Sequence, residues 1–133
     1  MTMKGLFSRI AISVIIMGFL LPTGCGRGRR FIGGDGTYYE TGPVIGEGKV
    51  CFTLYSTKAK KVNLVGDFNN WSKTADSLYD REKEGLWRIC IPLSPGRYEY
   101  KFLVDGDKWS PDPANNEAVD DGFGGLNSVI TVD

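Results

Sequence analysis

The sequence has no histidine and only three cysteines among its 133 residues. Histidine is the commonest general base and the commonest metal ligand, so its absence removes the simplest routes to acid–base catalysis and to a metal site. Formal charge is balanced, with 16 basic and 16 acidic residues, whereas nucleic-acid-binding proteins usually carry a concentrated basic face. The composition therefore argues against an enzyme and against nucleic-acid binding, and it suggests neither a metal nor a cofactor.

The N-terminal apolar run is too short to span a bilayer. Residues 10–21 contain Ser13 as their only polar residue and follow Lys4 and Arg9, a pattern typical of a signal peptide. The next residues, "PTGC", resemble the cleavage site of bacterial lipoproteins, in which the cysteine becomes the lipidated first residue. We expect a signal peptide over 1–24 and an exported lipoprotein held on a membrane through Cys25, facing the periplasm or the cell exterior. An ordinary secretory peptide and an uncleaved anchor are the alternatives.

The segment after Cys25 is rich in glycine and arginine and shows no periodicity. Residues 26–43 read "GRGRRFIGGDGTYYETGP". Such a composition is typical of a flexible linker. We expect a tether over 25–43 and a folded domain over 44–133.

From Lys49 onward, apolar residues recur at every second position, and Gly, Pro and Asp mark the turns between these runs. Alternation of this kind indicates strands that are buried on one face and solvated on the other. Several short strands of this type predict an antiparallel β-sandwich. Lys101 and Leu103 fall on the predicted outer face. The predicted inward residues are Val50, Phe52, Leu54, Val62, Leu64, Trp87, Ile89, Ile91, Tyr98, Tyr100, Phe102 and Val104.

The three tryptophans occupy two kinds of position. Trp87 is in phase with Ile89 and Ile91, so core packing explains it. Trp71 and Trp109 lie in "GDFNNWSK" and "DGDKWSPDP", among turn-forming residues. A large aromatic residue in a turn either covers the end of the core or provides a binding platform, and both interpretations apply here.

Longer motifs identify a family. "VNLVGDFNNWSK", "GRYEYKFLVDGDKWSPDP" and "NSVITV" resemble the family-48 carbohydrate-binding modules, which include the glycogen-binding domain of the AMP-activated protein kinase β-subunit and the N-terminal domain of isoamylases. The resemblance runs from about Val50 to Val132. It implies an immunoglobulin-like sandwich of about seven short strands and non-catalytic binding of α-glucan, such as glycogen, starch or maltooligosaccharide.

The resemblance also implies which residues contact the sugar. The two platform tryptophans of the family fall on Trp71 and Trp109, its lysine on Lys101 and its asparagine on Asn127. The family has an aliphatic residue four positions before that asparagine, where this chain has Phe123, which either stacks on the sugar or closes the core. The chemistry is suitable, because aromatic faces match the C–H faces of glucose while Lys and Asn match its hydroxyl groups.

Other readings of the same residues remain open. The rival function is a protein-interaction or spacer domain that keeps the fold without binding sugar. Five carboxylates, Asp105, Asp107, Asp112, Asp120 and Asp121, lie in turn motifs and are expected to serve the turns. Cys51 and Cys90 are both out of phase with the core, and in the family's sandwich another strand separates their strands. We therefore expect two free thiols.

Overall fold

The computed structural model describes residues 29–32 and 38–133, with side chains from Thr41 onward. The predicted signal peptide and Cys25 lie outside these residues. Within the described ranges, no helix combines the length and apolar character needed to cross a membrane.

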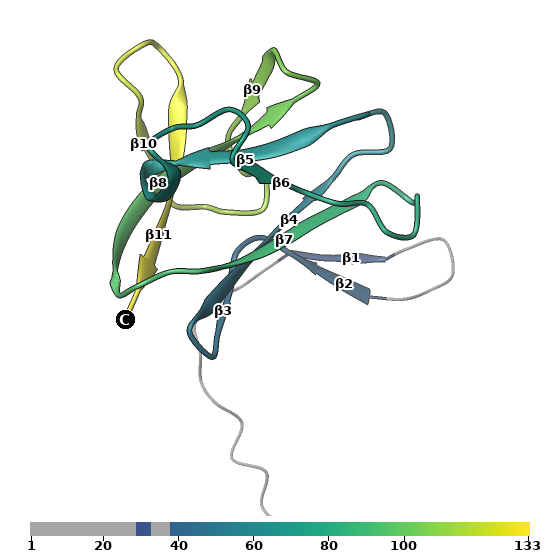
Figure 1. Ribbon diagram of the computed structural model, residues 1–133, viewed down its shortest axis with the longest axis horizontal. Coiled ribbons are helices and arrows are strands. Elements are labelled where there is room, and N and C mark those ends of the chain that lie inside the picture. Colours follow the sequence, from purple (N-terminus) through teal and green to yellow (C-terminus); the bar gives the residue numbers. More distant parts are fainter. Residues whose placement is uncertain (1–28, 33–37) are drawn as a thin grey trace, which may run out of the picture.

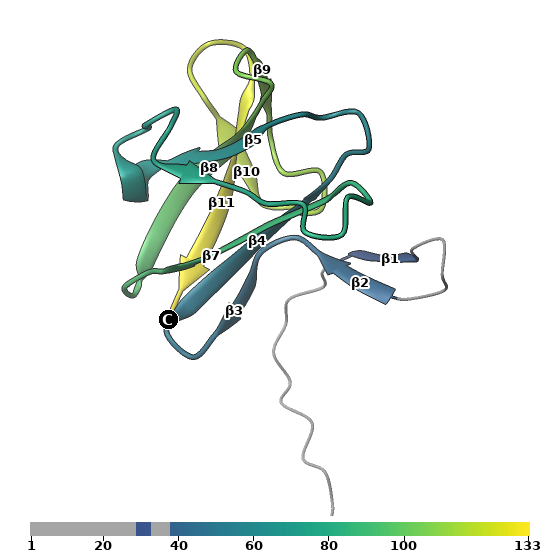
Figure 2. The ribbon, with the colours of Figure 1, turned by 45° about the vertical axis from the view of Figure 1, so that its right-hand side comes forward.

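Two antiparallel sheets form an immunoglobulin-like sandwich, as predicted (Figures 1 and 2). The smaller sheet has three strands in the order β3 (Val44–Gly46), β4 (Lys49–Tyr55) and β7 (Leu86–Pro92). The larger sheet has six strands, in the order β10-β11-β8-β5-β6, with β9 pairing with β8. Its strands are β5 (Val62–Gly66), β6 (Asp76–Ser77), β8 (Gly96–Val104), β9 (Lys108–Ser110), β10 (Ala118–Asp120) and β11 (Leu126–Val132).

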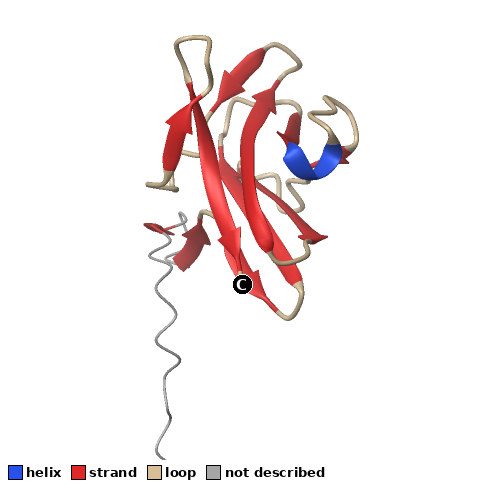
Figure 3. Ribbon diagram, turned by 90° about the vertical axis from the view of Figure 1, so that its left-hand side faces the viewer, coloured by secondary structure: helices blue, strands red, loops and turns tan. Residues whose placement is uncertain are grey.

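The structure has more strands than the seven or so that were expected, because several very short strands pair with the longer ones. β6 has two residues, and β9 and β10 have three each. Strands dominate the described part of the chain, and the short 3-10 turn η1 (Asp67–Asn69) is drawn in blue in Figure 3. β9 matters for the site, because it places Trp109 on a sheet edge.

The core lies between the two sheets and consists largely of the residues that alternation predicts. Trp87, Ile89 and Ile91 pack against it but are only partly buried. The Trp87 indole Nε1 donates a hydrogen bond to the Ser56 carbonyl over 3.0 Å, which satisfies its polar group. The buried core cluster comprises Val50, Phe52, Leu54, Val62, Leu64, Leu78, Tyr100, Phe102, Ile130 and Val132.

The outer face of the larger sheet is more covered than alternation implies. Leu103 was expected on a solvated face, yet it is 2% exposed, and Val65 on the same face is fully buried. β9 lies beside β8 here and places Trp109 directly opposite Leu103. Leu103, Val65 and the half-exposed Trp109 therefore form a small apolar patch on the outer face, apart from the core between the sheets.

The segment expected to be an irregular tether contains two strands. β1 (Arg29–Ile32) pairs antiparallel with β2 (Tyr38–Thr41). Thr41 at the end of β2 is buried. Regular structure is therefore present before residue 44, and the absence of periodicity did not exclude a short hairpin.

The expectation of two free thiols is wrong, because Cys51 and Cys90 form a disulfide. β4 and β7 are direct neighbours in the smaller sheet, and Cys51 lies opposite Cys90 with a Cα–Cα distance of 3.9 Å. Both residues are out of phase with the core, as predicted. The error lay in the expected strand order, which placed another strand between them.

Candidate functional site: an aromatic groove on the larger sheet

The turn after β5 sends one aromatic side chain inward and another outward. Phe68 lies within η1 and packs on the core, with its ring centroid 5.8 Å from that of Phe52. Asn70 and Trp71 follow with φ angles of 54° and 58°, a left-handed conformation that reverses the chain. The Trp71 side chain is consequently 37% exposed. The turn therefore uses Phe68 as its hydrophobic anchor and leaves Trp71 free to contact a ligand.

The carboxylate of Asp67 fixes this turn to the neighbouring strand. Its Oδ1 accepts a hydrogen bond from the Trp71 indole Nε1 over 3.2 Å, and its Oδ2 accepts one from the Glu99 backbone N–H over 2.8 Å. One side chain thus orients the indole ring and ties it to β8. Asn69 completes the turn by donating to the carbonyl of Leu64 and to Asp76.

Trp109 provides a second exposed ring. It is 44% exposed, and the β8–β9 register places it beside the outer face of β8. The Lys73 ammonium lies 5.6 Å from its ring centroid, within the range of a cation–π interaction. Since Lys73 follows Trp71 by two residues, this contact connects the turn that carries Trp71 with β9, the strand that carries Trp109.

Lys101 lies on the outer face of β8, as predicted, and it is paired with a carboxylate. Its Nζ is 2.5 Å from Asp121 Oδ2, and both side chains are 12% exposed. The hydrogen bond from Lys101, followed by those from the backbone N–H groups of Phe123 and Gly125, lowers the pKa of Asp121 to about 2. The pair is therefore charged at neutral pH, and both side chains are largely shielded from solvent.

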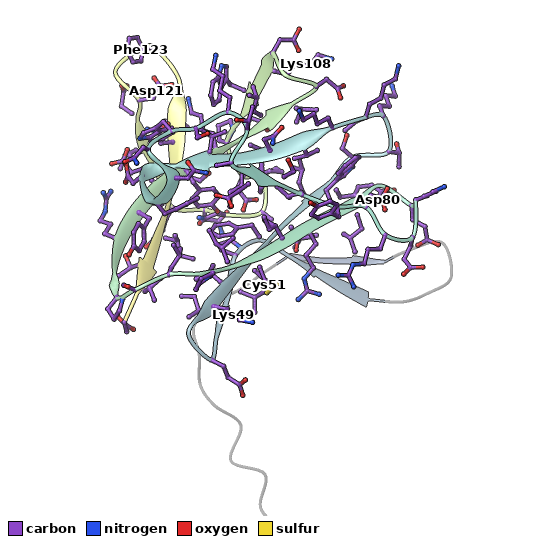
Figure 4. The ribbon with its side chains drawn as sticks, in the orientation of Figure 1. Lys49, Cys51, Asp80, Lys108, Asp121 and Phe123 are labelled. Atoms are coloured by element: carbon purple, nitrogen blue, oxygen red, sulfur yellow. A yellow bond between two sulfur atoms is a disulfide. The ribbon has the colours of Figure 1, made fainter. Side chains whose placement is uncertain are left out.

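Phe123 stands at the tip of the loop between β10 and β11 and is 95% exposed. Figure 4 shows it on the same loop as Asp121, at the end of the molecule where the β8–β9 turn also rises. The backbone N–H groups of Phe123 and Gly125 both donate to Asp121 Oδ1, over 2.8 and 2.9 Å. This position leaves the ring uncovered, so Phe123 does not close the core.

Asn127 is the second residue of β11 and contributes a polar side chain to the site. Its Nδ2 donates to Glu99 Oε2 over 2.9 Å, and the residue is 8% exposed. Asn127 is therefore more buried than a freely accessible surface donor, and its amide orientation is fixed by Glu99.

All five residues singled out in the sequence line one groove of about 750 Å³. This volume falls in the usual range for small-molecule sites. The lining combines aromatic rings with charged and amide side chains, which is a surface suited to a molecule with both C–H faces and hydroxyl groups. The lining consists of Trp71, Lys101, Trp109, Pro111, Asp121, Phe123, Gly124, Gly125, Leu126 and Asn127.

A second hollow of about 520 Å³ lies along β7, on the smaller sheet. Tyr79, which is 67% exposed, contributes to it together with several charged side chains. None of the five predicted residues lines this hollow. It provides a natural comparison surface for experiments on the groove.

A buried polar network holds the segment that follows Trp109. Asp112 is 3% exposed, its Oδ2 accepts a hydrogen bond from the Tyr100 hydroxyl over 2.8 Å, and its Oδ1 accepts the Ala114 N–H. Burial raises the pKa of Asp112, although these hydrogen bonds oppose the change. Burial, followed by the charge of Asp112, raises the pKa of Tyr100. The network fixes the segment between β9 and β10 at the edge of the groove.

Asp105 and Asp120 also bind backbone groups through their carboxylates, as predicted. Asp105 accepts the N–H groups of Lys60 and Lys61, which lower its pKa, and Asp120 accepts that of Gly122. Across the described residues, no group of three or more carboxylate and cysteine side chains is arranged to hold a metal ion.

A sandwich that presents exposed aromatic rings and polar groups in one shallow groove has the character of a carbohydrate-binding module. The family described as Carbohydrate-binding module 48 (Isoamylase N-terminal domain) matches residues 36–120. This chain belongs to that family. The match includes Trp71, Lys101 and Trp109 and ends before Phe123 and Asn127.

Similar proteins share this module as a small part of a longer chain. Protein FLOURY ENDOSPERM 6, chloroplastic, from Oryza sativa subsp. japonica is 32% identical over 70% of this chain and 17% of its own length. The 1,4-alpha-glucan branching enzyme GlgB of Corynebacterium jeikeium is 32% identical over 56% of this chain and 11% of the enzyme. GlgB 1 of Clostridium perfringens strain 13 is 40% identical over 42% of this chain and 8% of the enzyme. The chain therefore spans less than a fifth of these relatives.

Sequence reasoning missed the residues that position the platforms. Asp67 orients Trp71, Lys73 faces Trp109, and Asp121 pairs with Lys101. The sequence predicts only a turn role for Asp121, and the side chain serves the turn as well as the ion pair. The run "DDGFGG" is the signal that could have drawn attention to the loop, since it combines a capping carboxylate with glycines around an exposed aromatic residue.

Proposed function

We propose that this domain binds α-glucan without catalysis, and that the groove over β8 and β11 is the binding site. The observation that carries the proposal is that two exposed indole rings, of Trp71 and Trp109, line the same groove as a charged lysine and an asparagine. The relatives support the class of ligand, because the names of the branching enzymes refer to 1,4-alpha-glucan.

The groove combines the two kinds of contact that a glucose chain offers. Each indole face stacks on the C–H face of a sugar ring, and by analogy with stacked bases each such contact contributes ~1–3 kcal/mol. The remaining N–H groups of Lys101 and the side-chain oxygen of Asn127 bind hydroxyl groups, contributing ~1.5–3 kcal/mol for a bond to the charged lysine and ~0.5–1.5 kcal/mol for one to the neutral amide. Phe123 adds a third ring at the rim.

The groove is poorly equipped for hydrolysis. Glycoside hydrolases use two carboxyl groups across the scissile bond, one of them with a raised pKa. Among the residues that line the groove, Asp121 supplies the carboxylate, and its pKa is lowered to about 2 by Lys101 and the loop amides. A carboxylate held ionised in this way is a poor proton donor, so the arrangement favours binding.

The test is retention on insoluble starch with a matched control. The wild type is expected to sediment with starch, while a Trp71→Ala, Trp109→Ala double variant stays in solution. Tyr79→Ala is the control, since it removes an exposed aromatic ring from the other hollow, and it is expected to bind like the wild type. Equal retention of the wild type and the double variant, or retention of neither, would contradict the proposed site and favour a docking or spacer role.

We further propose that the protein is exported and attached to a membrane through lipid on Cys25. The Cys51–Cys90 disulfide supports export, because structural disulfides persist in oxidising compartments outside the cytosol. Mass spectrometry of the protein from native membranes tests this. A mature N-terminus at Cys25 carrying acyl chains is expected, and an unmodified Met1 or a start elsewhere would refute the anchor.

A further inference from the structure

The loop between β10 and β11 carries the most exposed aromatic ring of the groove, yet it is tied to the sheet by a charged contact. Lys101 comes from β8 and Asp121 from the first residue after β10. Exposed ion pairs contribute little because water and salt screen them. This pair is only 12% exposed on each side, so screening is reduced and the contact can hold the loop.

The two oxygens of Asp121 serve different purposes. Oδ1 accepts the N–H groups of Phe123 and Gly125 and so shapes the loop, while Oδ2 binds Lys101 and joins the loop to β8. A Cβ atom at Gly125 would lie 2.7 Å from Asp121 Oδ2, closer than side chains approach in practice. Glycine at this position therefore leaves room for the carboxylate to reach the lysine.

We propose that Asp121 is a positioning residue for glucan binding. Its pairing with Lys101 holds the 121–125 loop against β8, and this places the ring of Phe123 at the rim of the groove as a third platform. The inference rests on the proposed function of the groove. It assigns part of the role of Lys101 to holding the loop, in addition to any contact with sugar.

The loop contact is tested first in the ligand-free protein. Asp121→Asn keeps an oxygen that can accept both loop N–H groups but removes the charge that binds Lys101. Asp120→Asn is the matched control, because it makes the same change one residue earlier, where Asp120 binds only the Gly122 N–H. We expect the Phe123 and Gly125 amide protons to exchange about tenfold faster in Asp121→Asn and within about twofold of the wild type in Asp120→Asn. Unchanged exchange in Asp121→Asn would overturn the proposal.

Binding of maltoheptaose then tests the link to Phe123. We expect Asp121→Asn and Phe123→Ala each to raise the dissociation constant roughly tenfold, the scale of one lost ring contact. If Asp121 acts by placing Phe123, the double variant is no weaker than the weaker single variant. Multiplied effects would mean that Asp121 contacts sugar independently, which contradicts a positioning role. A wild type that does not bind maltoheptaose refutes the proposed function, and the amide exchange still decides the loop contact.

Discussion

Removing the disulfide separates the stability of the sandwich from the function of its groove. Cys51 and Cys90 are 39 residues apart in sequence and join β4 to β7. Closing a loop of about 40 residues lowers the entropy of the unfolded chain by about 13 cal/mol/K, which corresponds to about 4 kcal/mol at 25 °C. The Cys51→Ser, Cys90→Ser double variant should therefore lose about 4 kcal/mol of unfolding free energy.

Urea unfolding monitored by circular dichroism measures this change. Since small domains lose about 1–3 kcal/mol per molar urea, the midpoint should fall by more than about 1 M. The wild type in excess dithiothreitol is expected to match the double variant. Affinity for maltoheptaose should stay the same, because the disulfide lies on the smaller sheet and the groove on the larger one. A loss below about 1 kcal/mol, or a parallel loss of sugar binding in folded protein, would refute this reasoning.

Three further predictions concern single residues. Gly66→Ala should lower the free energy of unfolding by about 1–3 kcal/mol and weaken sugar binding. The added Cβ would lie 2.6 Å from the Glu99 carbonyl oxygen, next to the turn that carries Trp71. A thermal unfolding curve like that of the wild type would contradict this prediction. Asp112 has a raised pKa in the folded state, so the stability that it contributes is present at acidic pH and is lost as pH rises through that pKa. In Asp112→Asn, the free energy of unfolding measured against pH should no longer show this loss. The Asp121 carboxyl should titrate near pH 2 by ¹³C NMR, so sugar binding should persist at pH 4, and a midpoint near 4 would show that its contact with Lys101 is absent.

The fold was predictable because one face of each long strand is buried. Tyr100 and Phe102 are inward and fully buried, and their alternation with polar neighbours identifies the strand without further information. The same logic failed at Leu103, because alternation assumes that the outer face is solvated. Trp109 on the neighbouring strand β9 lies opposite Leu103 on that face, and a three-residue strand leaves no periodic signal.

The missed contacts depend on which strands are neighbours. The Cys51–Cys90 bond requires β4 and β7 to be adjacent and in a particular register, and periodicity determines neither. The pair of Lys101 and Asp121 likewise joins residues 20 positions apart. The five candidate site residues came from motif resemblance, and the structure places them in one groove. Their contacts with sugar remain predictions.

The most direct measurement follows the three indole N–H signals by ¹H–¹⁵N NMR during titration with maltoheptaose. Trp71 and Trp109 line the groove, whereas Trp87 packs on the core and donates to the Ser56 carbonyl, so each spectrum contains its own control. We expect the signals of Trp71 and Trp109 to shift together with one dissociation constant while that of Trp87 stays in place. Signals of Trp71 and Trp109 that do not move at saturating sugar, or sugar-dependent shifts confined to residues around Tyr79, would contradict the account.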